Sequence, residues 1–208
     1  MYYSDKIEDA DNERWIKNND FVYLNGDTGT GKSTYIFEKL IPHILWNTHK
    51  HIFILSNRKL LTKQHRKAAK TLDINYEFYE MNGYFVSERY SIMTYQAFHD
   101  IYIKKRNIEI DLDCEVFSGD DFVFILDECH YFLSDFWNKT TEQTLNTILK
   151  FKATTFFMSA TGDNVIDFVN LISDKKITEQ NTVSIFQDYS NITLKSIKDN
   201  TKKPQGNC

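Results

Sequence analysis

Residues 26–33 read Gly26-Asp27-Thr28-Gly29-Thr30-Gly31-Lys32-Ser33 and fit the pattern G-x-x-x-x-G-K-[ST] at every position. Glycines let a backbone curl so that its N–H groups surround phosphate oxygens, and the following helix adds the positive end of its dipole. The lysine of such a loop reaches the β- and γ-phosphates, and the serine hydroxyl binds Mg²⁺. The sequence therefore predicts a nucleoside triphosphate site at these eight residues and the adjacent Thr34.

The chain around this loop has the order strand, loop, helix that the motif requires. Residues 21–25 form a short apolar run typical of a strand, and apolar side chains recur at helical spacing across 34–46. Further apolar runs at 51–55, 122–126 and 154–158 alternate with helical stretches. This alternation predicts an α/β fold with a doubly wound, mostly parallel sheet.

Length and composition exclude several protein classes. A chain of 208 residues with 41% hydrophobic residues is long enough for one sizeable domain. The apolar runs are too short to cross a membrane, residues 1–20 lack the apolar core of a signal peptide, and the three cysteines lack metal-ligand spacing. We therefore expect a cytoplasmic protein. Because the net charge is −4, any nucleic-acid binding must use local basic patches.

A second chemical signal, Asp127-Glu128-Cys129-His130, directly follows the apolar run at the middle of the chain. Its carboxylates are expected at the carboxyl edge of the sheet, where the phosphate loop also opens. An aspartate there can hold Mg²⁺ together with Ser33, and the glutamate can deprotonate the water that attacks the γ-phosphate. We expect Cys129 to be a small buried side chain and His130 to link the site to its surroundings.

A third signal, Ser159-Ala160-Thr161, ends the apolar run at 154–158. Together and in this order, the three signals resemble motifs I, II and III of the first RecA-like lobe of a superfamily 2 helicase, the second being a variant of the DEAD/DEAH box. Ser56-Asn57-Arg58 is similar to motif Ia, and residues 93–98 look like the Thr-Tyr-Gln version of motif Ib. The resemblance covers about residues 21–162 and implies a P-loop NTPase fold with helicase-type ATP hydrolysis.

The resemblance implies ATP and Mg²⁺ as cofactors, and DNA or RNA as a partner. The implied catalytic residues are Lys32, Asp127 and Glu128, with Ser33 and Asp127 holding the metal. The implied coupling residues are Ser159 and Thr161, which join His130 in that role, and the implied contacts to a nucleic-acid backbone are Arg58 and Thr94. The residue that recognises adenine is left open, since Tyr3, Trp15 and Tyr23 could each stack on a base or serve in packing.

The densest basic run of the chain is residues 58–70, which contains no acidic residue. Its cations recur at three- and four-residue steps, so Lys63, Arg66 and Lys67 can share one face of a helix. That face could pair with phosphates of a nucleic acid, or it could be an ordinary solvated surface.

We expect three segments: an N-terminal extension at 1–20, a RecA-like ATP-binding domain at 21–174, and a linker or tail at 175–208. No arginine follows Arg106, so the residues expected from a second lobe are absent from this sequence. We therefore expect weak independent turnover and a partner subunit that supplies that lobe. The alternatives are a non-hydrolysing regulatory module that binds ATP and nucleic acid, and an ATPase like those of DNA-packaging motors.

Overall fold

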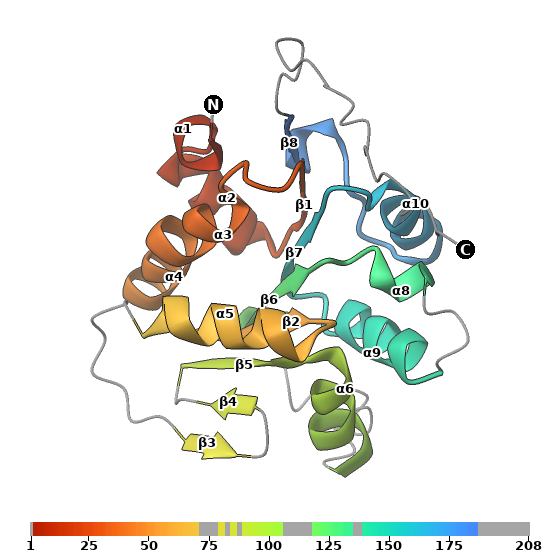
Figure 1. Ribbon diagram of the computed structural model, residues 1–208. Coiled ribbons are helices and arrows are strands. Elements are labelled where there is room, and N and C mark those ends of the chain that lie inside the picture. Colours follow the sequence, from red (N-terminus) through yellow and green to blue (C-terminus); the bar gives the residue numbers. More distant parts are fainter. Residues whose placement is uncertain are drawn as a thin grey trace, which may run out of the picture.

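One sheet forms the centre of the molecule. The computed structural model describes residues 2–70, 79–81, 84–86, 89–105, 118–134 and 139–186. Within these residues the sheet is 8-stranded, with the order β3-β4-β5-β2-β6-β7-β1-β8 (Figure 1). The strands from β5 to β8 in this order run parallel, and β4 and β3 add an antiparallel edge. The predicted doubly wound, mostly parallel α/β fold is confirmed.

The strands are β1 Phe21–Gly26, β2 His51–Ser56, β3 Tyr79–Met81, β4 Tyr84–Val86, β5 Tyr90–Thr94, β6 Phe122–Asp127, β7 Thr154–Ser159 and β8 Thr182–Ile185. The α-helices are α1 Tyr3–Lys6, α2 Asp9–Asn18, α3 Lys32–Tyr35, α4 Ile41–Asn47, α5 Lys59–Ala69, α6 Tyr95–Phe98, α8 Tyr131–Ser134, α9 Lys139–Lys150 and α10 Asp163–Ile172. The π-helical turns Ile36–Leu40 and His99–Lys105 continue α3 and α6, and the 3₁₀ turns are Gly119–Asp121 and Glu179–Asn181.

Each face of the sheet buries its own hydrophobic core. Helices α1 to α4 lie on one side, and α6, α9 and α10 lie on the other (Figure 1). Alternate residues of a strand point to opposite faces, so Val22 and Leu24 join the first core while Phe21 and Tyr23 join the second. Such continuous apolar strands are typical of a parallel sheet covered on both faces.

Strand register brings the polar ends of the central strands into one row. Ser56 at the end of β2 is paired with Thr94 of β5 on one side and with Asp127 of β6 on the other. Asp127 in turn is level with Met158, next to Ser159 at the end of β7. Because β1 also ends at this edge, the phosphate loop opens beside these residues. The carboxyl edge of the sheet therefore gathers all the sequence signals.

The segments predicted to flank the domain pack against it. Tyr3 of α1 and Trp15 of α2 are fully buried in the first core, and β8 pairs with β1 along Thr182–Ile185. Where the independently folding domain begins and ends stays a prediction, and the predicted tail beyond residue 186 lies outside the described residues. Within the described ranges, none of the helices combines the length and apolar character that crossing a membrane requires.

Candidate nucleotide site at the carboxyl edge of the sheet

The phosphate loop connects β1 to α3 through a tight turn that depends on glycine. Gly29 and Gly31 have φ angles of 86° and 83°, a region that residues with a Cβ rarely adopt. A Cβ at Gly26 would collide with the carbonyl oxygen of Ile185 and lie 2.6 Å from the Tyr3 hydroxyl. Thr30 is buried, and its hydroxyl donates to the carbonyl oxygen of Asp27 at 2.7 Å. These constraints give the loop the curled form that phosphate binding requires.

The Lys32 ammonium group lies inside this loop. Its Nζ donates to the carbonyl oxygens of Gly26 and Asp27, the second at 3.0 Å. Burial lowers the pKa of Lys32, while the nearby carboxylates of Glu128, Asp127 and Asp27 act in the opposite direction. A partly desolvated cation that faces acidic neighbours is well placed to attract a polyanion, and its donors can move from loop carbonyls to phosphate oxygens.

The acidic pair lies at the end of β6, beside the loop. Asp127 is buried, and its Oδ2 lies 2.9 Å from Nε2 of His65 on α5. Glu128 has a φ of 55°, which is left-handed and unfavourable for a residue with a Cβ. Such conformations persist where the surrounding structure imposes them, and they cluster at functional sites. Asp127 is the last residue of β6, and Glu128 is the first residue of the turn that follows it.

His130 connects the acidic pair to the end of β7. Its Nδ1 lies 3.2 Å from Oε2 of Glu128 and 3.0 Å from the Ser159 hydroxyl. The same hydroxyl accepts a hydrogen bond from the backbone N–H of Thr161 at 3.0 Å. The three predicted coupling residues therefore form one chain of polar contacts that begins at Glu128.

Two side chains of the second core lie at the acidic turn: Tyr95, which contacts it, and Cys129, which belongs to it. The buried Tyr95 hydroxyl donates to the carbonyl oxygen of Asp127 at 2.7 Å, and burial raises the pKa of Tyr95 well above its usual value. Cys129 is also fully buried, and burial raises the pKa of its thiol, with Asp127 and Glu128 acting in the same direction. Cys129 thus occupies the core as a neutral thiol, in the position that the sequence suggested.

One cleft joins the loop to the acidic pair. It has a volume of about 580 Å³, and its lining residues are Tyr2, Ser4, Thr28, Gly29, Gly31, Lys32, Ser33, Thr34, Leu61, Gln64, Asp127 and Glu128. A cleft of about 590 Å³ between α9 and α10 is slightly larger but contains none of the predicted site residues. The Ser33 hydroxyl and the Asp127 carboxylate are hard oxygen ligands of the kind that Mg²⁺ prefers, so this lining fits a Mg-ATP complex.

The aromatic residue of this cleft is one that the sequence did not single out. Tyr3, Trp15 and Tyr23 are at most 2% exposed, so none of them is available to stack on a base. Tyr2 is 57% exposed and would lie 3.1 Å from a Cβ placed on Gly31. The N-terminal helix brings Tyr2 there, because the buried Tyr3 hydroxyl donates to the carbonyl oxygen of Asn25 at 2.5 Å.

The predicted nucleic-acid contacts lie farther along the same edge and have partners of their own. Arg58 donates to the Tyr131 hydroxyl at 2.5 Å, with its guanidinium 5.6 Å from the ring centroid. The Thr94 hydroxyl caps α6 by accepting from the N–H of Ala97 at 3.1 Å. On α5, Lys63 and Lys67 are exposed, whereas Arg66 is half-buried. The predicted basic face is therefore formed chiefly by lysines.

Comparison with known proteins identifies the family. Residues 3–164 match the family described as "Type III restriction enzyme, res subunit" (ResIII). The match begins at the helix that carries Tyr3 and ends just after the Ser159–Thr161 segment. No curated protein matches the chain.

Proposed function

The chain belongs to the ResIII family, a helicase-like ATPase domain of superfamily 2 with the RecA fold, and we propose that it binds Mg-ATP at residues 26–34 and hydrolyses it in response to nucleic acid. One observation carries the proposal. The phosphate loop and the Asp127–Glu128 pair lie in the same cleft, with a cation, a hydroxyl and two carboxylates facing one volume. Anion binding, metal binding and proton transfer are the three tasks of phosphoryl transfer.

In this proposal Ser33 and Asp127 hold Mg²⁺, which when bound neutralises part of the triphosphate charge. Lys32 exchanges its loop carbonyls for phosphate oxygens. Glu128 orients the attacking water and accepts its proton, and the contact with His130 keeps the carboxylate in position. Asp-Glu-Cys-His then acts as a variant of the DEAD/DEAH box, a role that the contacts of Glu128 and His130 support.

The coupling to nucleic acid is proposed to run from Ser159 and Thr161 through His130 to Glu128. A cleft of about 570 Å³ has His130 in its lining, together with Asn57, Gln96 and Tyr131. Amide and phenol side chains of this kind commonly contact nucleic-acid backbones. This neighbourhood supports a DNA or RNA strand that passes over the ends of β2 and β5, near Arg58, Thr94 and α5.

We also propose that full activity needs a second RecA-like lobe, which a partner subunit can supply. Within the described residues, no arginine lines the nucleotide cleft. An arginine that contacts the γ-phosphate is worth about 10³ to 10⁵ in rate in related phosphoryl-transfer enzymes. A cytoplasmic location, where ATP and nucleic acid are both present, completes the proposal.

The test is ATP turnover by the purified chain, with and without single-stranded DNA or RNA, using Lys32→Ala as the blank. Turnover above this blank that rises with nucleic acid supports the proposal. ATP binding that depends on Lys32 but is followed by no turnover, even with a partner lobe added, would instead favour a non-hydrolysing regulatory module. Equal ATP binding by the wild type and Lys32→Ala would refute the assignment of the loop.

A further inference from the structure

His65 connects helix α5, proposed to meet nucleic acid, with the acidic pair of the candidate nucleotide cleft. It lies on the inner face of α5 and is 4% exposed, with its ring centroid 5.6 Å from that of Phe37. Its Nε2 lies 2.9 Å from Oδ2 of Asp127, the proposed metal ligand. Phe37 comes from the helical segment that follows the phosphate loop, so the imidazole is enclosed between that segment and the acidic pair.

The hydrogen bonding fixes which nitrogen carries the proton. Nδ1 of His65 is buried and has no hydrogen-bond partner among the described residues. A carboxylate oxygen can only accept, so a proton on Nδ1 would turn the lone pair of Nε2 toward Oδ2 of Asp127 and would also leave a buried donor unsatisfied. The favoured tautomer therefore carries its proton on Nε2 and donates to Oδ2 of Asp127. This bond holds one carboxylate oxygen and leaves the other for a metal ion.

Helix α5 contacts the acidic turn at two points. Near the middle of the helix, His65 holds Asp127, and at its N-terminal end Arg58 donates to the Tyr131 hydroxyl. The outer face of the same helix carries the exposed Lys63 and Lys67. The helix proposed to meet nucleic acid is thus directly bonded to both ends of the segment that contains the acidic pair.

We propose that His65 is a positioning residue for the metal carboxylate: its Nε2–H orients Asp127, so that the affinity for Mg²⁺ depends on the placement of α5. This inference rests on the proposed function. Groups that hydrogen-bond to a metal ligand orient it and raise its effectiveness, and losing one typically reduces metal affinity or activity 10- to 100-fold. The residue acts through Asp127 and does not itself touch the nucleotide.

The experiment measures how binding of a fluorescent ATP analogue depends on Mg²⁺, starting from metal-free buffer. His65→Phe keeps a ring against Phe37 but removes the donor, whereas His65→Gln retains an N–H near the position of Nε2. We expect His65→Phe to raise the Mg²⁺ concentration for half-maximal effect about 10-fold or more. The metal-free affinity should stay unchanged, and His65→Gln should restore most of the Mg²⁺ response.

His99→Phe is the matched control. His99 hydrogen-bonds Gln143 at 2.9 Å and does not line the nucleotide cleft, so its loss should leave the Mg²⁺ response as in the wild type. If the melting temperature shows that His65→Phe does not fold, His65→Ala also removes the donor and must give the same shift.

The outcomes separate this inference from the function on which it rests. A wild-type Mg²⁺ response in His65→Phe, or a response in His65→Gln as weak as in His65→Phe, overturns the positioning role alone. A wild-type chain that binds no nucleotide overturns the proposed function, and the role of His65 falls with it.

Discussion

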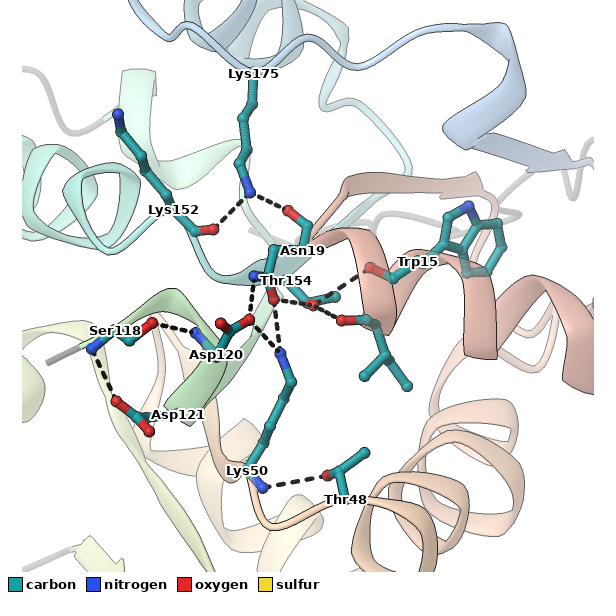
Figure 2. Close-up of polar contacts among 11 residues, drawn as sticks. Trp15, Asn19, Thr48, Lys50, Ser118, Asp120, Asp121, Lys152, Thr154 and Lys175 are labelled. Carbon is teal, nitrogen blue, oxygen red and sulfur yellow. Dashed lines mark hydrogen bonds and ion pairs between the residues drawn. The ribbon is translucent and has the colours of Figure 1, made fainter.

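The two edges of the sheet use polar groups in opposite ways. At the carboxyl edge, Lys32 and Asp127 line an open cleft, and Glu128 is held in a left-handed conformation. At the amino edge, Figure 2 shows Asn19 in a network of polar contacts with its neighbours. Its amide donates to Asp120 at 2.7 Å and accepts from Lys50 at 2.6 Å. One edge leaves its polar groups lining an open cleft, while the other pairs them with each other.

Lysines illustrate the difference most clearly. Lys175 at the amino edge donates to the carbonyl oxygens of Asn19 at 2.5 Å and Lys152 at 2.6 Å, and so connects three turns of the chain (Figure 2). Lys32 also donates to two carbonyl oxygens, but both belong to its own loop. Burial lowers the pKa of both lysines. Replacing Lys175 should therefore affect stability, whereas replacing residues around Lys32 should affect chemistry.

The largest expected effect is on turnover. Glu128→Gln removes the proposed base but keeps the size of the side chain, so turnover should fall by about 10²- to 10⁴-fold. ATP affinity and melting temperature should remain near those of the wild type, because Glu128 is partly exposed and binds no phosphate in the proposal. The measurement is steady-state phosphate release beside equilibrium nucleotide binding. Undiminished release would mean that another group accepts the proton.

The next effect is on stability at the opposite edge. Lys175→Met keeps the aliphatic chain but leaves the carbonyl oxygens of Asn19 and Lys152 without this donor. We expect the free energy of unfolding to fall by about 1 to 3 kcal/mol, nearer the lower value because the site is partly exposed. Urea denaturation measures this change. The neighbouring Lys176→Met is the control, since its bonds to Asn170 and Ser173 are both exposed.

The affinity for ATP is a second measurement on Lys175→Met. Lys175 lies outside the nucleotide cleft, so Lys175→Met should bind ATP as the wild type does. A weaker affinity in a folded Lys175→Met protein would show that the two edges are coupled through the sheet, which would contradict the division described above.

A smaller expected effect comes from backbone strain, which can be compared directly at one residue of each edge. Glu128 and Lys152, with φ angles of 55° and 51°, are both left-handed residues with long side chains, one at each edge. Replacing either with glycine removes the steric cost of the Cβ, which should stabilise the fold by about 1 kcal/mol. Lys152→Gly should keep turnover and Glu128→Gly should lose it. If Glu128→Gly were instead destabilising, its side-chain contacts would outweigh the strain.

Local patterns predicted much of this molecule. The glycines of the phosphate loop have the positive φ angles that its sequence requires, and the apolar runs at 122–126 and 154–158 are central parallel strands. Because parallel strands all end at one edge, their order along the chain was enough to bring Asp127 and Ser159 near the loop. Periodicity and turn chemistry act over short distances, so one sequence is enough to read them.

The contacts of Tyr2, His65 and Asn19 could not be predicted in the same way. Tyr2 reaches the loop because the neighbouring Tyr3 anchors α1. His65 on α5 contacts Asp127 at the end of β6. Asn19 joins residues more than 100 positions away. Each contact depends on how whole elements pack, and none has a motif. Tyr3, Trp15 and Tyr23, considered as base-stacking candidates, are buried for the same reason.

The smallest effect concerns lysines that have no internal partner. Among the described residues, Lys63 and Lys67 make no hydrogen bond or ion pair, in contrast to Lys50, which is bonded to Asn19. If Lys63 and Lys67 each neutralise one phosphate of a single strand, replacing both with alanine should reduce the slope of log affinity against log salt by about 1.4. Fluorescence anisotropy of a labelled oligonucleotide at several salt concentrations measures this slope.

Lys50→Ala should leave it unchanged, because that ammonium group lies at the amino edge and already has partners. An unchanged slope in the double variant would make this face of α5 a solvated surface. A reduced slope in Lys50→Ala would place the nucleic acid at the amino edge instead.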